Sequence, residues 1–111
     1  MEAKNLRIGN LITIHDQLQE IVELPLPENC TKENTKGIYL NYKTEHLLKD
    51  NLQIGSELGY YELSDGLEIN IDYCVYCGRK FLVELKYVHE LQNLFFAIKK
   101  TELDVSKMLS D

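Results

Sequence analysis

The hydrophobic pattern of the chain changes its period between Leu85 and Tyr87, and this change constrains the fold more than any other feature of the sequence. Before it, over residues 67–75, apolar and polar residues alternate, which predicts an antiparallel strand with one buried face and one wet face. After it, apolar residues recur at helical spacing as far as Lys100, which predicts an amphipathic helix. Because the apolar stripe of a helix needs a surface to cover, we expect this helix to pack on the inward face of the preceding strands.

Two turn signals divide this second half of the chain into strands. The Asp65-Gly66 pair between apolar runs predicts a hairpin. We expect one strand to follow it, with five side chains toward the core: Leu67, Ile69, Ile71, Tyr73 and Val75. The chain is then expected to turn at residues 77–79 and to return as a strand with three inward side chains: Phe81, Val83 and Leu85.

The first half of the chain predicts shorter and less regular elements. Residues 6–14 and 18–24 alternate imperfectly, which is typical of curved strands in a small SH3-like barrel. A third short strand is predicted over residues 37–42, and Thr44 is the expected N-cap of a short helix over residues 45–50. The predicted fold class is α+β, with short curved N-terminal strands, a small central helix, and an antiparallel hairpin packed by a C-terminal helix.

A length of 111 residues predicts a single domain, since domains cluster near ~100–150 residues. We expect an ordered core over residues 5–100 and a polar, flexible tail over residues 101–111. No apolar run approaches the ~20 residues of a spanning helix, and the first residues lack the apolar stretch of a signal peptide. These features predict a cytoplasmic protein without membrane contact, in which the three cysteines remain reduced thiols.

The charge distribution predicts an acidic surface. A net charge of −6 argues against direct binding of duplex nucleic acid, and no basic residue lies between Lys49 and Arg79. Such a run is often only a solvated face. The alternative is an acidic face that docks on a basic groove of a protein partner. Its expected members are Glu62, Asp65, Glu68 and Asp72, of which Glu68 and Asp72 would lie on one side of a single strand, two pleats apart.

The Cys74-x-x-Cys77 pair, followed by glycine and a basic residue, resembles one knuckle of a zinc ribbon. A structural zinc site needs four ligands, and the chain has no second pair at that spacing. We therefore expect no metal in the monomer. A metal shared between two copies of the chain is the alternative that the sequence leaves open.

No arrangement of residues predicts catalysis. A nucleophilic cysteine or serine needs a histidine held by a third group, and the three histidines are scattered along the chain. A phosphate-binding glycine loop is also missing from the sequence. We therefore expect neither enzymatic activity nor a cofactor.

Three segments resemble a family of short, uncharacterised proteins of bacterial prophages and mobile elements. Residues 5–11 (NLRIGNL) resemble its opening, residues 44–49 (TEHLLK) its central helix, and residues 87–97 (YVHELQNLFFA) its closing helix. The resemblance implies that His89, Gln92 and Asn93 matter to the family, for folding or for binding. On the expected helix these side chains would form a polar strip beside the apolar stripe.

The genomic context that this resemblance implies shapes the functional expectation. We expect a non-enzymatic accessory protein that binds and inhibits a host defence nuclease through its acidic face. An RNA-guided CRISPR effector or its guide-RNA complex is the partner that fits this expectation. The alternative is a self-associating structural or assembly protein, with contacts through exposed tyrosines: Tyr39, Tyr42, Tyr60 and Tyr61.

Overall fold

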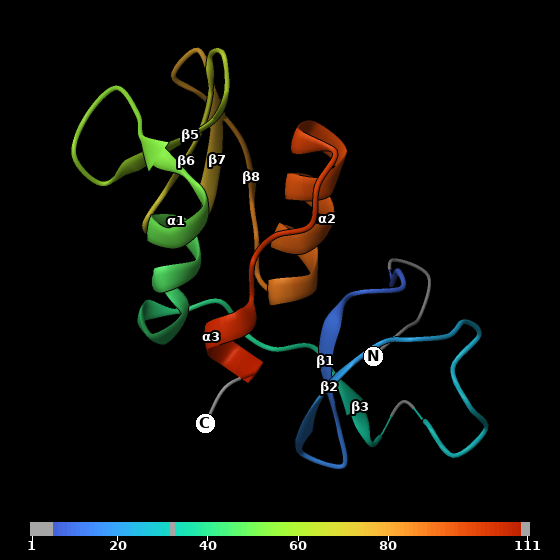
Figure 1. Cartoon of the computed structure of the whole chain (residues 1–111). Coiled ribbons are helices and arrows are strands. Elements are labelled where there is room, and N and C mark those ends of the chain that lie inside the picture. The colour runs from blue at the N-terminus through green and yellow to red at the C-terminus, as the bar shows by residue number, and fades with distance from the viewer. Residues whose placement is uncertain (1–5, 32, 110–111) are drawn as a thin grey trace.

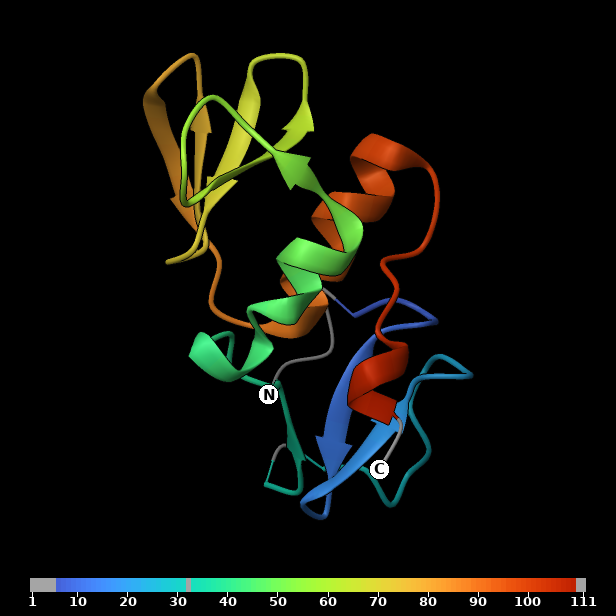
Figure 2. The ribbon, with the colours of Figure 1, turned by 60° about the vertical axis from the view of Figure 1, so that its left-hand side comes forward.

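The computed structural model describes residues 6–31 and 33–109 and confirms the α+β class, with two antiparallel sheets and short helices (Figures 1 and 2). The smaller sheet has the order β2-β1-β3, formed by β1 (Leu11–Ile14), β2 (Gln17–Glu20) and β3 (Thr35–Lys36). These strands are shorter than we expected. Within the predicted third strand, Tyr39 makes only an isolated bridge, to Tyr87.

The larger sheet contains five strands in sequential order. They are β4 (Gln53–Ile54), β5 (Tyr60–Ser64), β6 (Leu67–Asn70), β7 (Cys74–Cys77) and β8 (Lys80–Glu84). The predicted turns at Asp65-Gly66 and Gly78-Arg79 are confirmed. Gly66 and Gly78 both have positive φ, 79° and 56°, which glycine adopts without a steric penalty.

In the described part of the chain, two helical segments follow the smaller sheet, and two more follow the larger sheet at the C-terminal end of the chain. They are the 3-10 helix η1 (Tyr42–Thr44), α1 (His46–Asn51), α2 (Val88–Lys99) and α3 (Ser106–Leu109). The predicted C-terminal helix is therefore confirmed as α2. Thr44 does not cap α1. It belongs to a capping box in which Asn41 is the N-cap of η1, and the Thr44 hydroxyl accepts a hydrogen bond from the Asn41 amide at 3.0 Å.

The main core lies between α1, α2 and one face of the larger sheet. Its fully buried members include Leu47 and Leu48 of α1, Ile69 of β6, and Val88 and Leu91 of α2. Strand β1 contributes to two cores because its side chains alternate between faces. Leu11 joins the main core, while Ile12 packs in a smaller core with Leu6 and Ile21.

The strand predicted over residues 67–75 is wrong as a single element. The chain turns at Ile71 and Asp72 and returns as β7, so β6 and β7 are antiparallel neighbours. Asn70 is the physical reason for the break. Its side-chain oxygen accepts hydrogen bonds from the amides of Asp72 and Cys74, both at 3.0 Å, which holds the turn closed. Ile71, predicted to be buried, is consequently 46% exposed.

Two further expectations differ from the structure. On β8, Phe81 lies on the face away from the core, opposite Tyr76, and Val83 is on the core side but 46% exposed. The C-terminal residues pack back onto the molecule instead of leaving it as a tail, since Leu103 and Val105 are buried in the main core. Residues 5 and 32 of the predicted core and residues 110–111 of the predicted tail lie outside the described residues.

Candidate functional site

The larger sheet has one face that neither α1 nor α2 covers, which we call the outer sheet face. Register defines it: Ile69 and Val75 are buried on the core side, so their strand neighbours point the other way. Pairing with these neighbours extends the face over β5 and β8. Its members are Tyr60, Glu62, Glu68, Asn70, Cys74, Tyr76, Phe81 and Glu84.

Three aromatic rings form a row across the outer sheet face. The ring centroids of Tyr60 and Tyr76 are 5.8 Å apart, and those of Tyr76 and Phe81 are also 5.8 Å apart, in an edge-on geometry. Phe81 is 53% exposed, while the two tyrosines are half-buried. Aromatic faces carry negative electrostatic potential, so such a row attracts cations as well as apolar groups.

Carboxylates lie beside this row, in a groove of about 430 Å³ at one end of the sheet that we call the hairpin-tip groove. Glu62 and Glu68 both line it and are direct cross-strand partners on β5 and β6. Like charges in this position destabilise a sheet unless something compensates them. Part of the compensation is internal, since the backbone amide and hydroxyl of Ser56 both donate to the Glu68 carboxylate. Arg79 also lines the groove.

A second groove, of about 520 Å³, lies at the other end of the sheet, and we call it the turn groove. Its carboxylates are Glu45, Asp72 and Glu84. Tyr42, which is 80% exposed, lies on its wall. The buried side chain of Tyr73 fixes this region, because its hydroxyl is 2.8 Å from the Thr44 hydroxyl and donates to the carbonyl of Asn41. The turn groove therefore combines three carboxylates with an exposed aromatic ring on a fixed frame.

The structure brings together only part of the predicted acidic face. Glu62 and Glu68 share the hairpin-tip groove, and Asp65 is exposed in the adjoining turn between β5 and β6. Asp72 lies in the turn groove, beyond the end of β6. The prediction that Glu68 and Asp72 lie two pleats apart on one strand is wrong, because the chain has already turned at Asp72.

The predicted polar strip on α2 is engaged inside the molecule. Gln92 is 1% exposed, and its side chain accepts from the Leu11 amide at 2.8 Å and donates to the Gly9 carbonyl at 3.0 Å. The side-chain oxygen of Asn93 accepts from Arg7 at 3.0 Å and from Asn10 at 2.8 Å. Of the roles left open for these two residues, the geometry supports folding, because they join the opening segment of the chain to its closing helix.

His89 is also buried, at 5% exposure, and its ring stacks on Tyr87 with centroids 5.4 Å apart. Burial lowers the pKa of His89, and the nearby charge of Glu90 opposes this shift. Within the described part of the chain, its Nδ1 atom has no hydrogen-bond partner. His89 is therefore a neutral, inward-facing side chain and offers little to an external partner.

Cys74 and Cys77 point to opposite faces of β7. Alternation along β7 is unbroken, so Cys74 shares the outer sheet face with Tyr76, and Cys77 points to the side of Val75. Burial raises the pKa of the Cys74 thiol, and the charges of Glu84 and Asp72 raise it further. One ion cannot be held by both sulfurs of the same chain. Among residues 6–31 and 33–109, no group of three or more His, Cys, Asp or Glu side chains could hold a metal.

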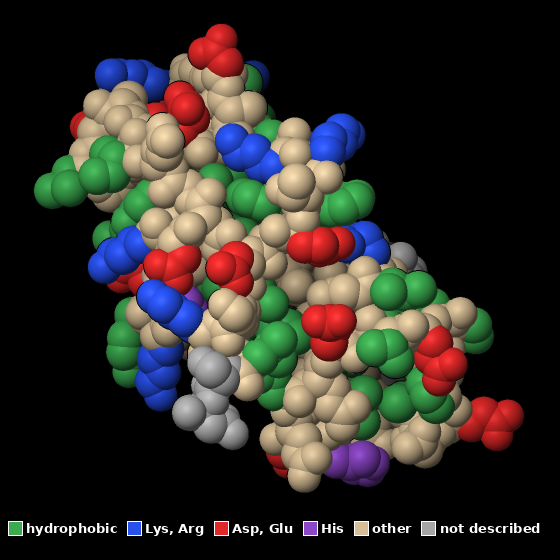
Figure 3. All heavy atoms as spheres, in the orientation of Figure 1, with side chains coloured by type: hydrophobic (Ala, Val, Ile, Leu, Met, Phe, Trp, Pro, Cys, Tyr) green, Lys and Arg blue, Asp and Glu red, His purple; other side chains and the backbone are tan. Residues whose placement is uncertain are grey.

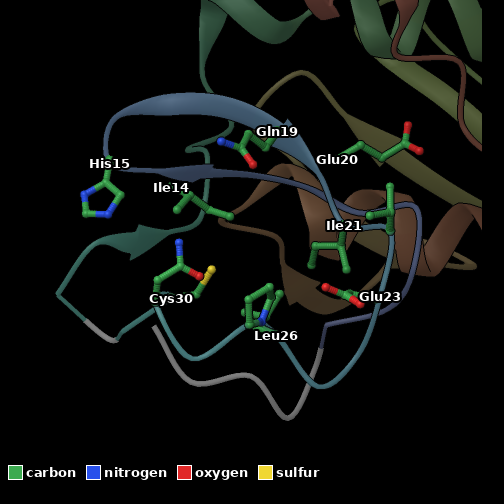
Figure 4. A pocket seen from close by; sticks show the side chains of 11 residues that line it. Ile14, His15, Gln19, Glu20, Ile21, Glu23, Leu26 and Cys30 are labelled. Atoms are coloured by element: carbon green, nitrogen blue, oxygen red, sulfur yellow. The ribbon is translucent and has the colours of Figure 1, made fainter.

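The smaller sheet and its loops form one lobe of the molecule, and the larger sheet with its helices forms the other. A third hollow, of about 200 Å³, lies in the smaller lobe, and apolar side chains such as Ile14, Ile21 and Leu26 line it (Figure 4). In Figure 3 the surface of this lobe, at the lower right, mixes apolar and acidic side chains. His15 and Cys30 line the same hollow, and the Nδ2 atom of Asn34 is 3.1 Å from His15 Nε2. A cysteine, a histidine and an asparagine thus lie in one region, as in some nucleophilic sites.

The hydrogen bonds of Asn34 argue against that chemistry. Its oxygen accepts from the Thr31 amide and its nitrogen donates to the Asn29 carbonyl, which fixes the amide orientation. The Asn34 nitrogen therefore donates to His15 Nε2, and the proton of the neutral ring resides on Nδ1. A histidine that activates a thiol through Nδ1 needs the opposite tautomer.

Comparisons with protein-family models, curated proteins and solved structures found no match. The resemblance to prophage and mobile-element proteins therefore stays a prediction. No helix within residues 6–31 and 33–109 has the length and apolar character needed to cross a bilayer.

Sequence reasoning missed the aromatic row. The sequence predicts Phe81 on the core side, and it predicts no exposed role for Tyr76, which lies between Cys74 and Cys77. A signal for the turn between β6 and β7 is Asn70-Ile71-Asp72, two turn-forming residues around one apolar residue. A turn there places Tyr76 opposite Glu68. The pairing of Tyr76 with Phe81 depends on the register shift in the β7–β8 hairpin, which the hydrophobic pattern does not indicate.

Proposed function

We propose that the protein is a non-enzymatic binding protein that docks a basic surface of a protein partner on its outer sheet face. The observation that carries this proposal is the aromatic row of Tyr60, Tyr76 and Phe81, which runs across the strands between two carboxylate-lined grooves at the two ends of the sheet. The absence of Lys and Arg between Lys49 and Arg79 means that β5, β6 and β7 bring no positive charge to this face.

The aromatic and acidic side chains of this face suit the binding of lysine and arginine side chains. A lysine or arginine side chain can place its aliphatic stem on an aromatic ring and its charge beside a carboxylate. Cation–π contacts contribute roughly 0.5–2 kcal/mol each, and complementary charges mainly raise the association rate. A face of mixed aromatic and acidic character thus favours a basic protein surface over a nucleic-acid backbone.

The partner class that we propose is a host defence nuclease, such as an RNA-guided effector or its guide-RNA complex. Nucleases hold their substrates in basic channels, and an acidic protein surface seated there would block substrate entry. The support for this choice is the complementarity of charge, together with the resemblance to proteins of mobile elements.

A charge-reversal experiment tests the proposal. Glu62→Lys with Glu84→Lys reverses two exposed charges on the outer sheet face, and Glu20→Lys with Glu28→Lys is the matched control on the other lobe. We expect the wild type and the control to retain a basic partner from host lysate, and the outer-face variant to lose it. Retention should weaken as salt rises. If all three proteins capture the same partner equally, the outer sheet face is not the interface.

Exposed tyrosines favour one second candidate, the self-associating accessory protein. Tyr39 and Tyr42 are 61% and 80% exposed, which is high for large aromatic side chains. Light scattering between ~10 and 500 μM separates the two candidates. A stable oligomer that dissociates when both residues are changed to Ser favours self-association.

A further inference from the structure

We infer that strand β8 is an addition site for an extended segment of the partner, in which basic and apolar residues alternate. This inference rests on the proposed function and specifies how the partner is held. The segment would extend the larger sheet by one strand. Its basic side chains would lie over the outer sheet face and its apolar side chains on the opposite face.

The position of β8 supports strand addition. It is the last strand of the sheet, and within the described residues only β7 pairs with it. All five of its residues are exposed. In Figure 2 the β7–β8 hairpin projects at the upper left, away from α1 and α2. An exposed edge strand offers backbone donors and acceptors that an extended peptide can satisfy, with its alternate side chains read on the two faces.

The side chains of β8 differ between the two faces. Phe81 and Glu84 belong to the outer sheet face, where they pair with Tyr76 and Cys74. Val83 points to the core side opposite Val75, yet it is 46% exposed because the helices do not reach it. An added strand would therefore meet an aromatic ring and a carboxylate on one face. On the other face it would meet the aliphatic side chain of Val83, with Lys80 at the turn end of the strand.

This asymmetry sets the chemistry of the segment. On the outer sheet face, a lysine or arginine can contact both the Phe81 ring and the Glu84 carboxylate. On the core side, a valine, isoleucine or leucine can extend the apolar surface of Val83. Since side chains alternate along a strand, both requirements are met only by alternating basic and apolar residues.

A second copy of the chain fits β8 less well than such a segment. The register shifts between Val75 and Tyr76, so Leu82 has no partner on β7 and forms a bulge in the middle of the edge. Any added strand meets this bulge, but two copies would have to accommodate two bulges in one pairing, whereas a separate segment has to accommodate only one. Pairing would also bring two outer sheet faces of the same acidic character side by side, in chains of net charge −6.

Two synthetic probes test the inference, both with blocked ends. One is a nonapeptide of strictly alternating Lys and Val, and the other has the same composition in two blocks. We expect the alternating peptide to bind the wild-type protein at least ~10-fold more tightly in fluorescence anisotropy at low salt. Hydrogen exchange of the β8 amides should slow when it binds. An alternating peptide that is N-methylated on one edge should lose most of this affinity.

A pair of matched variants locates the site. Val83→Asp places a charge on the core side of β8, and Val22→Asp makes the same change at a residue that is 75% exposed in the other lobe. We expect a loss of at least ~10-fold in affinity for Val83→Asp and no change for Val22→Asp. Circular dichroism confirms that both variants are folded, and the N-methylated probe gives an answer with wild-type protein if Val83→Asp is not.

The outcomes separate this inference from the proposed function. If both peptides bind equally and Val83→Asp has no effect, strand addition is overturned while basic docking on the outer sheet face stands. If neither peptide binds but charge reversal abolishes partner capture, the same conclusion holds. If neither peptide binds and capture is unchanged, both proposals fail. Protected β8 amides in a dimer of the chain alone would show that a second copy occupies the edge.

Discussion

Gln92 shows at the residue scale how one side chain can join distant parts of a chain. It pairs with the Leu11 amide and the Gly9 carbonyl, and it is 1% exposed. Gln92→Ala would leave these two backbone groups without a partner, and a buried unsatisfied group costs ~1–3 kcal/mol. We expect urea denaturation to show a loss of roughly 2–4 kcal/mol. Gln19→Ala, the same change at an exposed position of β2, should stay within ~0.5 kcal/mol of the wild type. A similar small effect for Gln92→Ala would contradict its structural role.

His89 makes stability depend on pH. Burial holds its pKa below the ordinary value of 6.5, so the unfolded chain takes up a proton at higher pH than the folded chain. The stability that neutral His89 contributes is complete above pH ~6.5 and is lost as the pH falls toward its folded-state pKa. We expect His89→Gln to flatten the decline in unfolding free energy between pH 7 and pH 5. Parallel curves for wild type and His89→Gln would show that His89 is not responsible.

At the scale of elements, the extended backbone of β7 keeps Cys74 and Cys77 from binding one metal ion together. A strand separates residues three positions apart onto opposite faces, whereas a zinc knuckle gathers them around one ion. We expect elemental analysis of protein purified without a tag or added metal to find far less than one zinc per chain. The Cys77→Ser variant should give the same value. Stoichiometric zinc that disappears in this variant would show that two copies share a metal through their exposed Cys77 thiols.

Element types were easier to predict from the sequence than element ends. The helix α2 and both glycine turns follow from local patterns, because the apolar stripe and the Asp65-Gly66 pair each specify a backbone conformation directly. The β6–β7 turn was missed because alternation continues through it: Ile71 and Tyr73 keep the same period as Ile69 and Val75. Side-chain hydrogen bonds of Asn70 override that period, and they depend on a three-dimensional arrangement that a hydrophobic pattern does not encode.

At the scale of the whole molecule, the absence of basic residues between Lys49 and Arg79 predicted an acidic surface. It did not predict which carboxylates lie close to one another. Glu62 and Glu68 meet through strand pairing, and Asp72 meets Glu45 and Glu84 through a loop contact between distant segments. Such proximity depends on topology. The same holds for the α2 strip, where Gln92 looks like a surface residue by sequence until β1 is placed against it.

The two lobes should unfold as one unit, because β1 and α2 connect their cores. Leu11 and Ile12 bury adjacent side chains in different cores, and Arg7 binds Asn93 at 3.0 Å and Glu102 at 2.6 Å. All seven tyrosines lie between residues 39 and 87, so their near-ultraviolet circular dichroism reports on the larger lobe. Amide resonances of β1 and β2 report on the smaller one.

We expect both probes to give the same urea midpoint in the wild type. Arg7→Ala should lower both midpoints together, by an amount equivalent to roughly 1–2 kcal/mol, since a partly exposed ion pair and a cation–π contact are lost. An earlier transition of β1 and β2, with the tyrosine signal unchanged, would mean that the lobes are independent and that the Arg7 contacts do not couple them.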